Sequence, residues 1–332
     1  DHNILKIEDT KNKSKLGANT TLALSLAFAH AKAFEAKTDL YRFLSNDENF
    51  ILPVPMMNVI NGGAHADNNV DIQEFMIFPV GANSFSNALQ MGTETFHYLK
   101  SILANKNLST TVGDEGGFAP QNLTNSEAIN YVAESIEYAG YKLGDEVYIA
   151  LDVAASEFYI NNEYHLSREN KVLSSKLLAS EYKKLCQQYP IYSIEDGLSE
   201  DDWDGWSDLT KTLGNKVQLV GDDLFVTQEK YLKKGIDNKS ANSILIKLNQ
   251  VGTVSETLSA IRLAKKSNFK CIISHRSGET EDTTISDFAV GVSAGQIKTG
   301  APNRSERVAK YNRLLSIEQT IGYNKYVGKN IL

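Results

Sequence analysis

The sequence predicts an α/β protein in which a parallel barrel follows a short helical segment. From about residue 147 onward, short apolar runs alternate with longer amphipathic segments, which is typical of a parallel sheet covered by helices. The number of these units favours a closed barrel over an open sheet. The apolar runs span residues 147–152, 191–196, 217–223, 243–249, 271–276 and 295–300.

The size and composition fit this fold and exclude several other classes of protein. The 332 residues exceed the ~250 of a single barrel and leave room for part of a second domain. The formal charge of −7, without any basic stripe, argues against nucleic acid as the main partner. No apolar run reaches the length of a membrane span, and no signal peptide opens the chain. Cys186 and Cys271 lie far apart, and we expect both to be buried, reduced thiols of a cytosolic protein.

The segment ahead of the barrel is predicted to be helical. Residues 17–36 are rich in Ala and Leu, and Asn19 or Thr20 can serve as the N-cap. A second short helix is expected at 38–44. We therefore expect a helical domain over 1–48 and the barrel over 49–332. Within the barrel, residues 174–189 and 255–268 are expected to form covering helices.

Each predicted strand begins apolar and ends in polar or charged side chains. In a parallel barrel these ends meet at one mouth, where active sites are built. The side chains concerned are Asp152, Glu195, Asp222, Lys247, His275 with Arg276, and Lys298. A lysine in an edge strand that reaches water would also explain Lys247, but would not explain five other strands with similar ends. We therefore place Lys247 in a site.

Three carboxylates at one mouth repel each other and need a cation. Asp152, Glu195 and Asp222 offer only oxygen ligands, which suit Mg²⁺ better than Zn²⁺. The alternative is that each carboxylate pairs with a nearby lysine or arginine. With a metal ion, Lys247, Arg276 and Lys298 would make a lining that favours an anion.

The residues that follow the strand at 271–276 are suited to a phosphate group. Arg276 provides a planar fork of donors and Ser277 a hydroxyl, next to the accessible main chain of Gly278.

Further candidates lie upstream on glycine-rich loops and at a strand start. His65 lies in NGGAHADN, Glu115 precedes two glycines in VGDEGGF, and Gln73 with Glu74 opens an apolar strand. Taken singly, His65 could be an ordinary loop residue and Glu115 an ordinary turn residue.

These stretches together resemble the enolase family, and the bacterial type in particular. The resemblance runs from about residue 13 to residue 313. It is carried by NGGAHADN, DIQEFMIFPVGA, VGDEGGFAP, ALDVAASEFY, SIEDGL, VGDDLFVTQ, LIKLNQVGT, ISHRSGETED and QIKTGAP. It implies a barrel of the ββαα(βα)₆ type, whose second strand is antiparallel to its neighbours.

The resemblance also implies a lyase that interconverts 2-phosphoglycerate and phosphoenolpyruvate in glycolysis and gluconeogenesis. Lys247 would remove the C2 proton, and Glu115, with Glu74 beside it, would protonate the leaving hydroxyl. Lys298 would face the substrate carboxylate and His275, Arg276 and Ser277 its phosphate. His65 and Gln73 would complete the pocket, with His65 also counted among the catalytic residues. The implied Mg²⁺ ligands are Asp152, Glu195 and Asp222.

The family has a mobile Ser-Gly-Ala-Ser-Thr-like loop in its N-terminal domain, and no such segment occurs in this sequence. We therefore expect 1–48 to be only the helical end of that domain. Of the two Mg²⁺ sites of the family, we expect only the tighter one to be fully encoded.

The family is cytoplasmic, partly found at the cell surface or secreted, and dimeric or octameric, with reported partners such as plasminogen. Another Mg²⁺-dependent member of the same superfamily and a binding or scaffold protein are the competing hypotheses.

For the proposed chemistry, the base should be neutral and the acid protonated. We expect nearby cations and burial to lower the pKa of Lys247, and the carboxylate of Glu74 to raise the pKa of Glu115.

Overall fold

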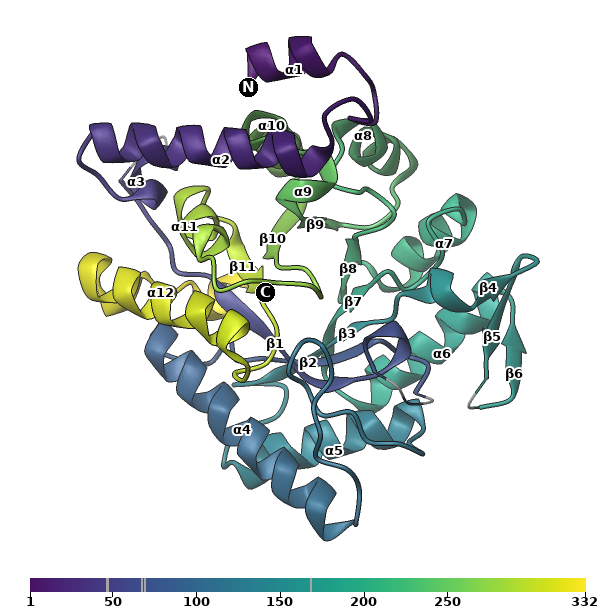
Figure 1. The fold of residues 1–332 in the computed structure, drawn as a ribbon. Helices are drawn as coiled ribbons and strands as arrows, with labels where there is room; N and C mark the ends of the chain where they lie inside the picture. Colours follow the sequence, from purple (N-terminus) through teal and green to yellow (C-terminus); the bar gives the residue numbers. More distant parts are fainter. Residues whose placement is uncertain (46–47, 67, 69, 168) are drawn as a thin grey trace.

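The computed structural model of the chain describes residues 1–45, 48–66, 68, 70–167 and 169–332. Within these residues, eight strands close a barrel, as predicted, in the ring order β1-β11-β10-β9-β8-β7-β3-β2 (Figure 1). All six apolar runs form strands. The barrel strands are β1 (Val54–Asn61), β2 (Glu74–Phe78), β3 (Tyr148–Asp152), β7 (Ile191–Glu195), β8 (Gln218–Gly221), β9 (Ser243–Ile246), β10 (Lys270–Ser274) and β11 (Gly295–Lys298).

Strand β2 runs against the direction of its two neighbours. It pairs antiparallel with β1 and with β3, whereas the other neighbouring strands of the barrel pair in parallel. Among its described residues, the connection from β1 to β2 holds the short 3₁₀ helix η1 (Gly63–His65) and no longer helix, because antiparallel strands need no crossover helix. The start of β2 therefore lies at the same mouth as the ends of the other strands, and the predicted ββαα(βα)₆ order is confirmed.

Five of the helices that cover the barrel, α4, α5, α6, α7 and α10, begin at a side-chain N-cap. Thr124 and Glu127 make a capping box at the start of α5, and the hydroxyl of Thr253 accepts a hydrogen bond from Glu256 N at the start of α10. These caps satisfy N–H groups that the first turn leaves open. The covering helices are α4 (Phe85–Asn105), α5 (Asn125–Tyr138), α6 (Ser175–Gln188), α7 (Trp203–Leu213), α8 (Glu229–Asn238), α9 (Leu248–Val251), α10 (Val254–Lys266), α11 (Thr284–Gly291) and α12 (Ser305–Ile321).

The N-terminal segment forms α1 (His2–Glu8), α2 (Ala18–Glu35) and α3 (Leu40–Leu44). Helix α2 lies against the α9–α10 side of the barrel (Figure 1), where Thr21 Oγ1 donates to Gly252 O at 2.8 Å. Its N-cap is Gly17, with φ of 86°, so the expectation of an Asn19 or Thr20 cap is wrong. The left-handed conformation of Gly17 turns the chain into the helix two residues earlier.

Other short elements lie outside the barrel sheet and do not change its topology. A three-stranded antiparallel sheet follows β3, and short 3₁₀ turns lie beside it and near the C-terminus (Figure 1). These elements are β4 (Tyr159–Ile160), β5 (Glu163–Leu166), β6 (Lys171–Leu173), η2 (Ala155–Phe158), η3 (Tyr323–Lys325) and η4 (Gly328–Ile331).

A layer of polar side chains crosses the barrel interior below the mouth. The amide groups of Gln218 and Gln296 exchange hydrogen bonds of 2.9 and 2.8 Å, and Gln218 also donates to Ser193 Oγ at 3.0 Å. All three side chains are buried. The layer is stable because each amide finds a partner without water.

Neither cysteine forms a disulfide. Cys271 is buried as expected, but Cys186 is only half-buried, because it lies on the outer helix α6. None of the helices in the described part of the chain has the length and apolar character that crossing a bilayer requires.

We predict that Gln296→Ala lowers the free energy of unfolding by about 1–3 kcal/mol, because the buried amide of Gln218 loses its reciprocal partner. Urea denaturation followed by circular dichroism measures this change. Gln90→Ala, at an exposed position of α4, should change stability by no more than about 0.5 kcal/mol. Equal effects of the two substitutions would contradict the role of the polar layer.

Candidate active site

Strand register brings the acidic residues to one rim of the barrel. Glu74 at the start of β2 pairs with Asp152 at the end of β3, and Asp152 pairs with Glu195 at the end of β7. Glu195 in turn pairs with Val220, so that Asp222 follows just beyond β8. Residues far apart in the sequence therefore lie side by side at the mouth.

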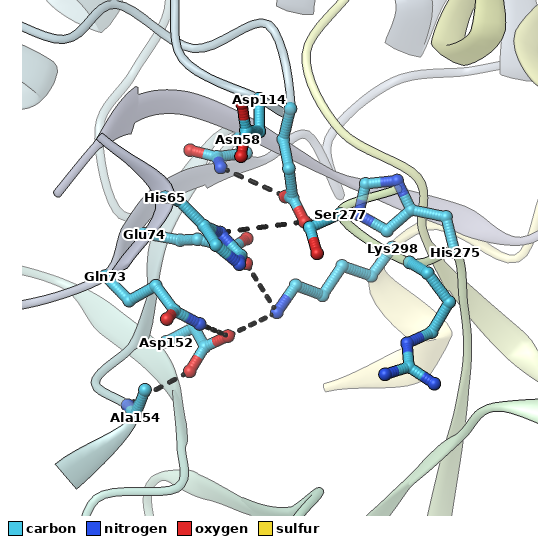
Figure 2. A network of polar contacts seen from close by, with 12 residues as sticks. Asn58, His65, Gln73, Glu74, Asp114, Asp152, Ala154, His275, Ser277 and Lys298 are labelled. Carbon is cyan, nitrogen blue, oxygen red and sulfur yellow. Dashed lines mark hydrogen bonds and ion pairs between the residues drawn. The ribbon is translucent and has the colours of Figure 1, made fainter. Parts of the chain in front are cut away.

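The ammonium group of Lys298 lies among these carboxylates, and Figure 2 shows it beside Asp152 and Glu74. Its Nζ is 2.7 Å from Asp152 Oδ2, 2.9 Å from both oxygens of Glu195 and 3.2 Å from Glu74 Oε1. Gln73 Nε2 approaches the same oxygen of Asp152 at 3.5 Å. One buried cation thus serves three carboxylates.

Lys247 follows β9 and points into the site. Its Nζ forms an ion pair with Asp222 Oδ2, and its side chain is 16% exposed. Gln250 Nε2 donates to the other oxygen of Asp222 at 2.9 Å. The alternative expectation, that the carboxylates pair with lysines, therefore describes the contacts of Asp222, Asp152 and Glu195.

Glu115 lies on the loop that returns beside β1. Phe118 N donates to Val59 O at 2.9 Å, which fixes the loop on the strand. Asn58 Nδ2 donates to Glu115 Oε2 at 3.2 Å, and His275 Nε2 lies 3.2 Å from Glu115 Oε1. The carboxyl group is therefore held on both of its oxygens.

His65 joins the two glutamates at the same side of the mouth. Its Nδ1 is 3.4 Å from Glu74 Oε1 and 3.7 Å from Glu115 Oε1. Arg276 and Ser277 are exposed at the rim, and Arg276 Nη1 donates to Asn249 Oδ1 at 2.9 Å. The structure therefore places all the predicted site residues at this mouth or its rim.

Glu74 and Glu115 differ in which one retains a proton. Burial, followed by the charge of Glu115, raises the pKa of Glu74 to about 7. Burial also acts to raise the pKa of Glu115, but His275, His65 and Lys298 outweigh it and hold that pKa well below its usual value. The expectation that Glu115 has the raised pKa is therefore wrong, because His275 contacts Glu115 alone whereas His65 lies near both glutamates, so that Glu74 is the one of the two that retains a proton.

The pKa of Lys247 also differs from expectation. Burial acts to lower it, but the charges of Asp222 and Glu195 outweigh burial and raise the pKa above its usual value. The expected lowering requires that these carboxylates be neutralised by another cation.

The mouth carries more negative charge than its own lysines can neutralise. The pKa of Glu195 is raised well above its usual value by burial and then by Asp152. Burial and Asp222 raise the pKa of Asp223 to about 6, and Glu74 Oε2 is buried without a hydrogen-bond partner among the described residues. Crowded, buried carboxylates of this kind fit a divalent cation with oxygen ligands.

The tightest acidic groups differ from the predicted set of metal ligands. Among the described residues, ligand atoms lie within 4.8 Å of one another in two groups. These groups are His65 with Glu74 and Glu115, and Asp196 with Asp222 and Asp223. Of the predicted ligands only Asp222 belongs to either group, since Asp152 and Glu195 close on Lys298 instead.

The sequence analysis missed several residues that shape the site. Asn58 is a polar residue in an apolar strand, a signal of the same kind as Lys247, and could have been found. Gln250 and the buried Arg307 gave no such signal, because each lies on a helix where polar residues are ordinary.

The fold and the mouth together define a TIM-barrel protein of the ββαα(βα)₆ type, with acidic and basic side chains gathered at one end. Residues 49–332 match the family described as enolase, C-terminal TIM barrel domain, and residues 1–44 match enolase, N-terminal domain. The chain belongs to the enolase family. This membership supports a hydro-lyase of the enolase superfamily that uses a metal ion.

We predict that His65 titrates with a pKa of about 9, because Glu74 and Glu115 outweigh the lowering effect of burial. Because this pKa lies above the usual value of 6.5, protonated His65 stabilises the folded state. This stabilisation is complete below pH 6.5 and is lost as the pH rises to about 9. An NMR titration of the ring measures this pKa in the metal-free protein.

Glu74→Gln should bring the pKa of His65 down towards its usual value, whereas Glu137→Gln, on the exposed face of α5, should leave it unchanged. A wild-type His65 that titrates below 6.5 would contradict the geometry.

Proposed function

We propose that the chain catalyses the reversible dehydration of 2-phosphoglycerate to phosphoenolpyruvate. The observation that supports this best is the placement of base and acid on opposite sides of one mouth. In the ring order of the barrel, β9 stands opposite β2, so Lys247 faces the Glu74 side across the opening. A substrate between them can lose a proton from one face and a hydroxyl group from the other.

Lys247 is proposed as the base that takes the C2 proton. Its amine is held by Asp222 at the rim and is partly open to the mouth. A base must be neutral before it accepts a proton, so its ion pair with Asp222 has to be relieved when substrate is bound.

The pair of Glu74 and Glu115 is proposed as the acid. The proton of this pair is on Glu74 and is available near neutral pH because the pKa of Glu74 lies near 7. Asn58 and His275 hold Glu115 in place, so that the pair presents one proton to the leaving hydroxyl group. Glu115 is the proposed donor, and Glu74 is the store from which its proton comes.

Arg276 and Ser277 are proposed to bind the phosphate group. Both are exposed at the rim, where a dianion can reach the guanidinium group and the hydroxyl without displacing core residues. His275 and Gln73 are proposed to contact the substrate beside them, and Lys298 is proposed to face the substrate carboxylate.

Asp152, Glu195 and Asp222 are proposed to hold Mg²⁺. When bound, the ion would neutralise the carboxylates that now pair with Lys247 and Lys298, and would stabilise the extra charge that develops on the substrate carboxylate.

The matched families also support a proposed division of the chain at residues 48 and 49. Ala29, Ala33 and Leu40 form a small core cluster of their own under α2 and α3. We further propose that the protein is cytoplasmic and forms a homodimer; light scattering of the purified protein tests the oligomeric state.

Phosphoenolpyruvate absorbance with purified protein, 2-phosphoglycerate and Mg²⁺ tests the proposed reaction. We predict Mg²⁺-dependent turnover that Lys247→Ala lowers by at least about 10²-fold, with a matching loss of C2 proton exchange. Lys329→Ala, at an exposed position near the C-terminus, is the control. If the protein turns over a different carboxylate from a substrate panel but not 2-phosphoglycerate, the result would favour another reaction of the superfamily. If it turns over none of them, the result would favour a binding protein.

Glu115→Gln and Glu74→Gln should separate the two proton transfers. We predict that each lowers dehydration by at least about 10²-fold but keeps measurable C2 exchange, because Lys247 remains. Deuterium exchange from solvent, followed by NMR, measures the first step alone. Equal loss of both steps in these variants would show that the glutamates do not act as a separate acid.

A further inference from the structure

Arg307 is a buried charge whose partners are almost all uncharged. It lies in the first turn of α12 and is 1% exposed. The ion pair that the described residues form with it is long, at 3.8 Å between Nε and Glu306 Oε1. Burying a guanidinium group is costly unless its donors are satisfied, so the groups that it contacts are informative.

The donors of Arg307 are directed at two loops of the active site. Nη1 lies 2.7 Å from Nδ1 of His275 and donates to Arg276 O at 2.6 Å. Nη2 donates to Ser277 O at 2.6 Å and to Asp114 O at 3.0 Å. One guanidinium group therefore joins the loop after β10 to the loop that carries Glu115.

The contact with His275 fixes the direction of a hydrogen bond. A guanidinium group has donors and no acceptor, so Nδ1 of His275 must accept and carries no hydrogen. Burial, with Arg307 and Lys298, outweighs Glu115 and lowers the pKa of His275, which keeps the ring neutral. The single hydrogen is then on Nε2, which lies 3.2 Å from Glu115 Oε1.

The main chain at Gly300 packs closely against both Arg307 and Glu115. Gly300 has φ of 84°, and a Cβ there would lie 2.8 Å from Cδ of Arg307 and 2.9 Å from Glu115 O. Ala301 N also donates to Glu115 O at 3.0 Å. The side chain of Arg307 and the main chain of Glu115 are therefore packed against the same turn.

We propose that Arg307 is a positioning residue that holds His275 as its Nε2–H tautomer, so that this hydrogen faces Glu115. Arg307 also holds the loop that carries Glu115 and the loop after β10 in a fixed position relative to each other. The effect on turnover rests on the proposed function, because Glu115 is the proposed donor. The tautomer itself does not rest on it.

A lysine could not replace Arg307 in this role. An ammonium group lacks the planar fork that reaches an imidazole nitrogen and three carbonyl oxygens at once. Without the guanidinium group, either nitrogen of His275 could carry the hydrogen, and a bare Nε2 would repel the Glu115 carboxylate.

NMR of the ¹⁵N-labelled histidines, with His275 assigned by comparison with His275→Gln, tests the tautomer at pH 7 in the full chain. We expect a protonated Nε2 and a bare Nδ1 in the wild type. Glu115→Gln should keep this tautomer if Arg307 selects it. An Nδ1–H tautomer or a doubly protonated ring in the wild type, or a change of tautomer in Glu115→Gln, would overturn the proposal.

Arg307→Lys should give a mixture of His275 tautomers and lower kcat by about 10- to 100-fold. Lys310→Met removes another buried cation of α12 one turn further on and should leave the His275 signals unchanged. A folded Arg307→Lys with wild-type His275 signals would also overturn the proposal. If the wild type does not turn over 2-phosphoglycerate, the proposed function fails, but the NMR spectra still show which tautomer His275 adopts. If Arg307→Lys does not fold, the spectra of the wild type and of Glu115→Gln are sufficient to test the tautomer.

Discussion

The arrangement at the mouth depends on one ammonium group shared among buried carboxylates. Lys298 contacts Glu74, Asp152 and Glu195, and without a cation at this position their mutual repulsion would be uncompensated in a region that excludes water. The same crowding explains why one carboxyl group at the mouth keeps a proton, and of Glu74 and Glu115 it is Glu74 that does so. Fold and chemistry are therefore coupled, because Lys298, which stabilises the mouth, lies where a substrate and a metal ion would add their own charges.

The overall fold could be predicted because its signals are local and repeated. Apolar runs of strand length, amphipathic segments between them and polar strand ends specify a barrel with one functional mouth. The reversed direction of β2 came from the resemblance alone, since nothing in 74–78 distinguishes a parallel from an antiparallel strand. The cap of α2 was mispredicted because a search for capping side chains overlooks Gly17. This residue has no side chain and starts the helix through its backbone conformation, with a positive φ.

The sequence predicted which residues lie at the site, but it did not predict the pKa values of Glu74, Glu115 and Lys247. Strand periodicity identified Lys247, and its convergence with Glu195 followed from the barrel. Which glutamate keeps the proton depends on the positions of two imidazole rings within 4 Å, and sequence spacing contains no such information. Arg307 escaped notice for a similar reason, because burial and hydrogen-bond direction belong to tertiary packing.

The order of charges around the ring has a consequence for how the chain is made. The strands that leave the ribosome first carry Glu74, Asp152 and Glu195, whereas Lys298 ends the last strand, β11, which pairs with β1 and closes the ring. Before β11 joins the sheet, these acidic strand ends lack the ammonium group that contacts all three of them. Closure of the cylinder and neutralisation of its rim by Lys298 therefore depend on the same strand.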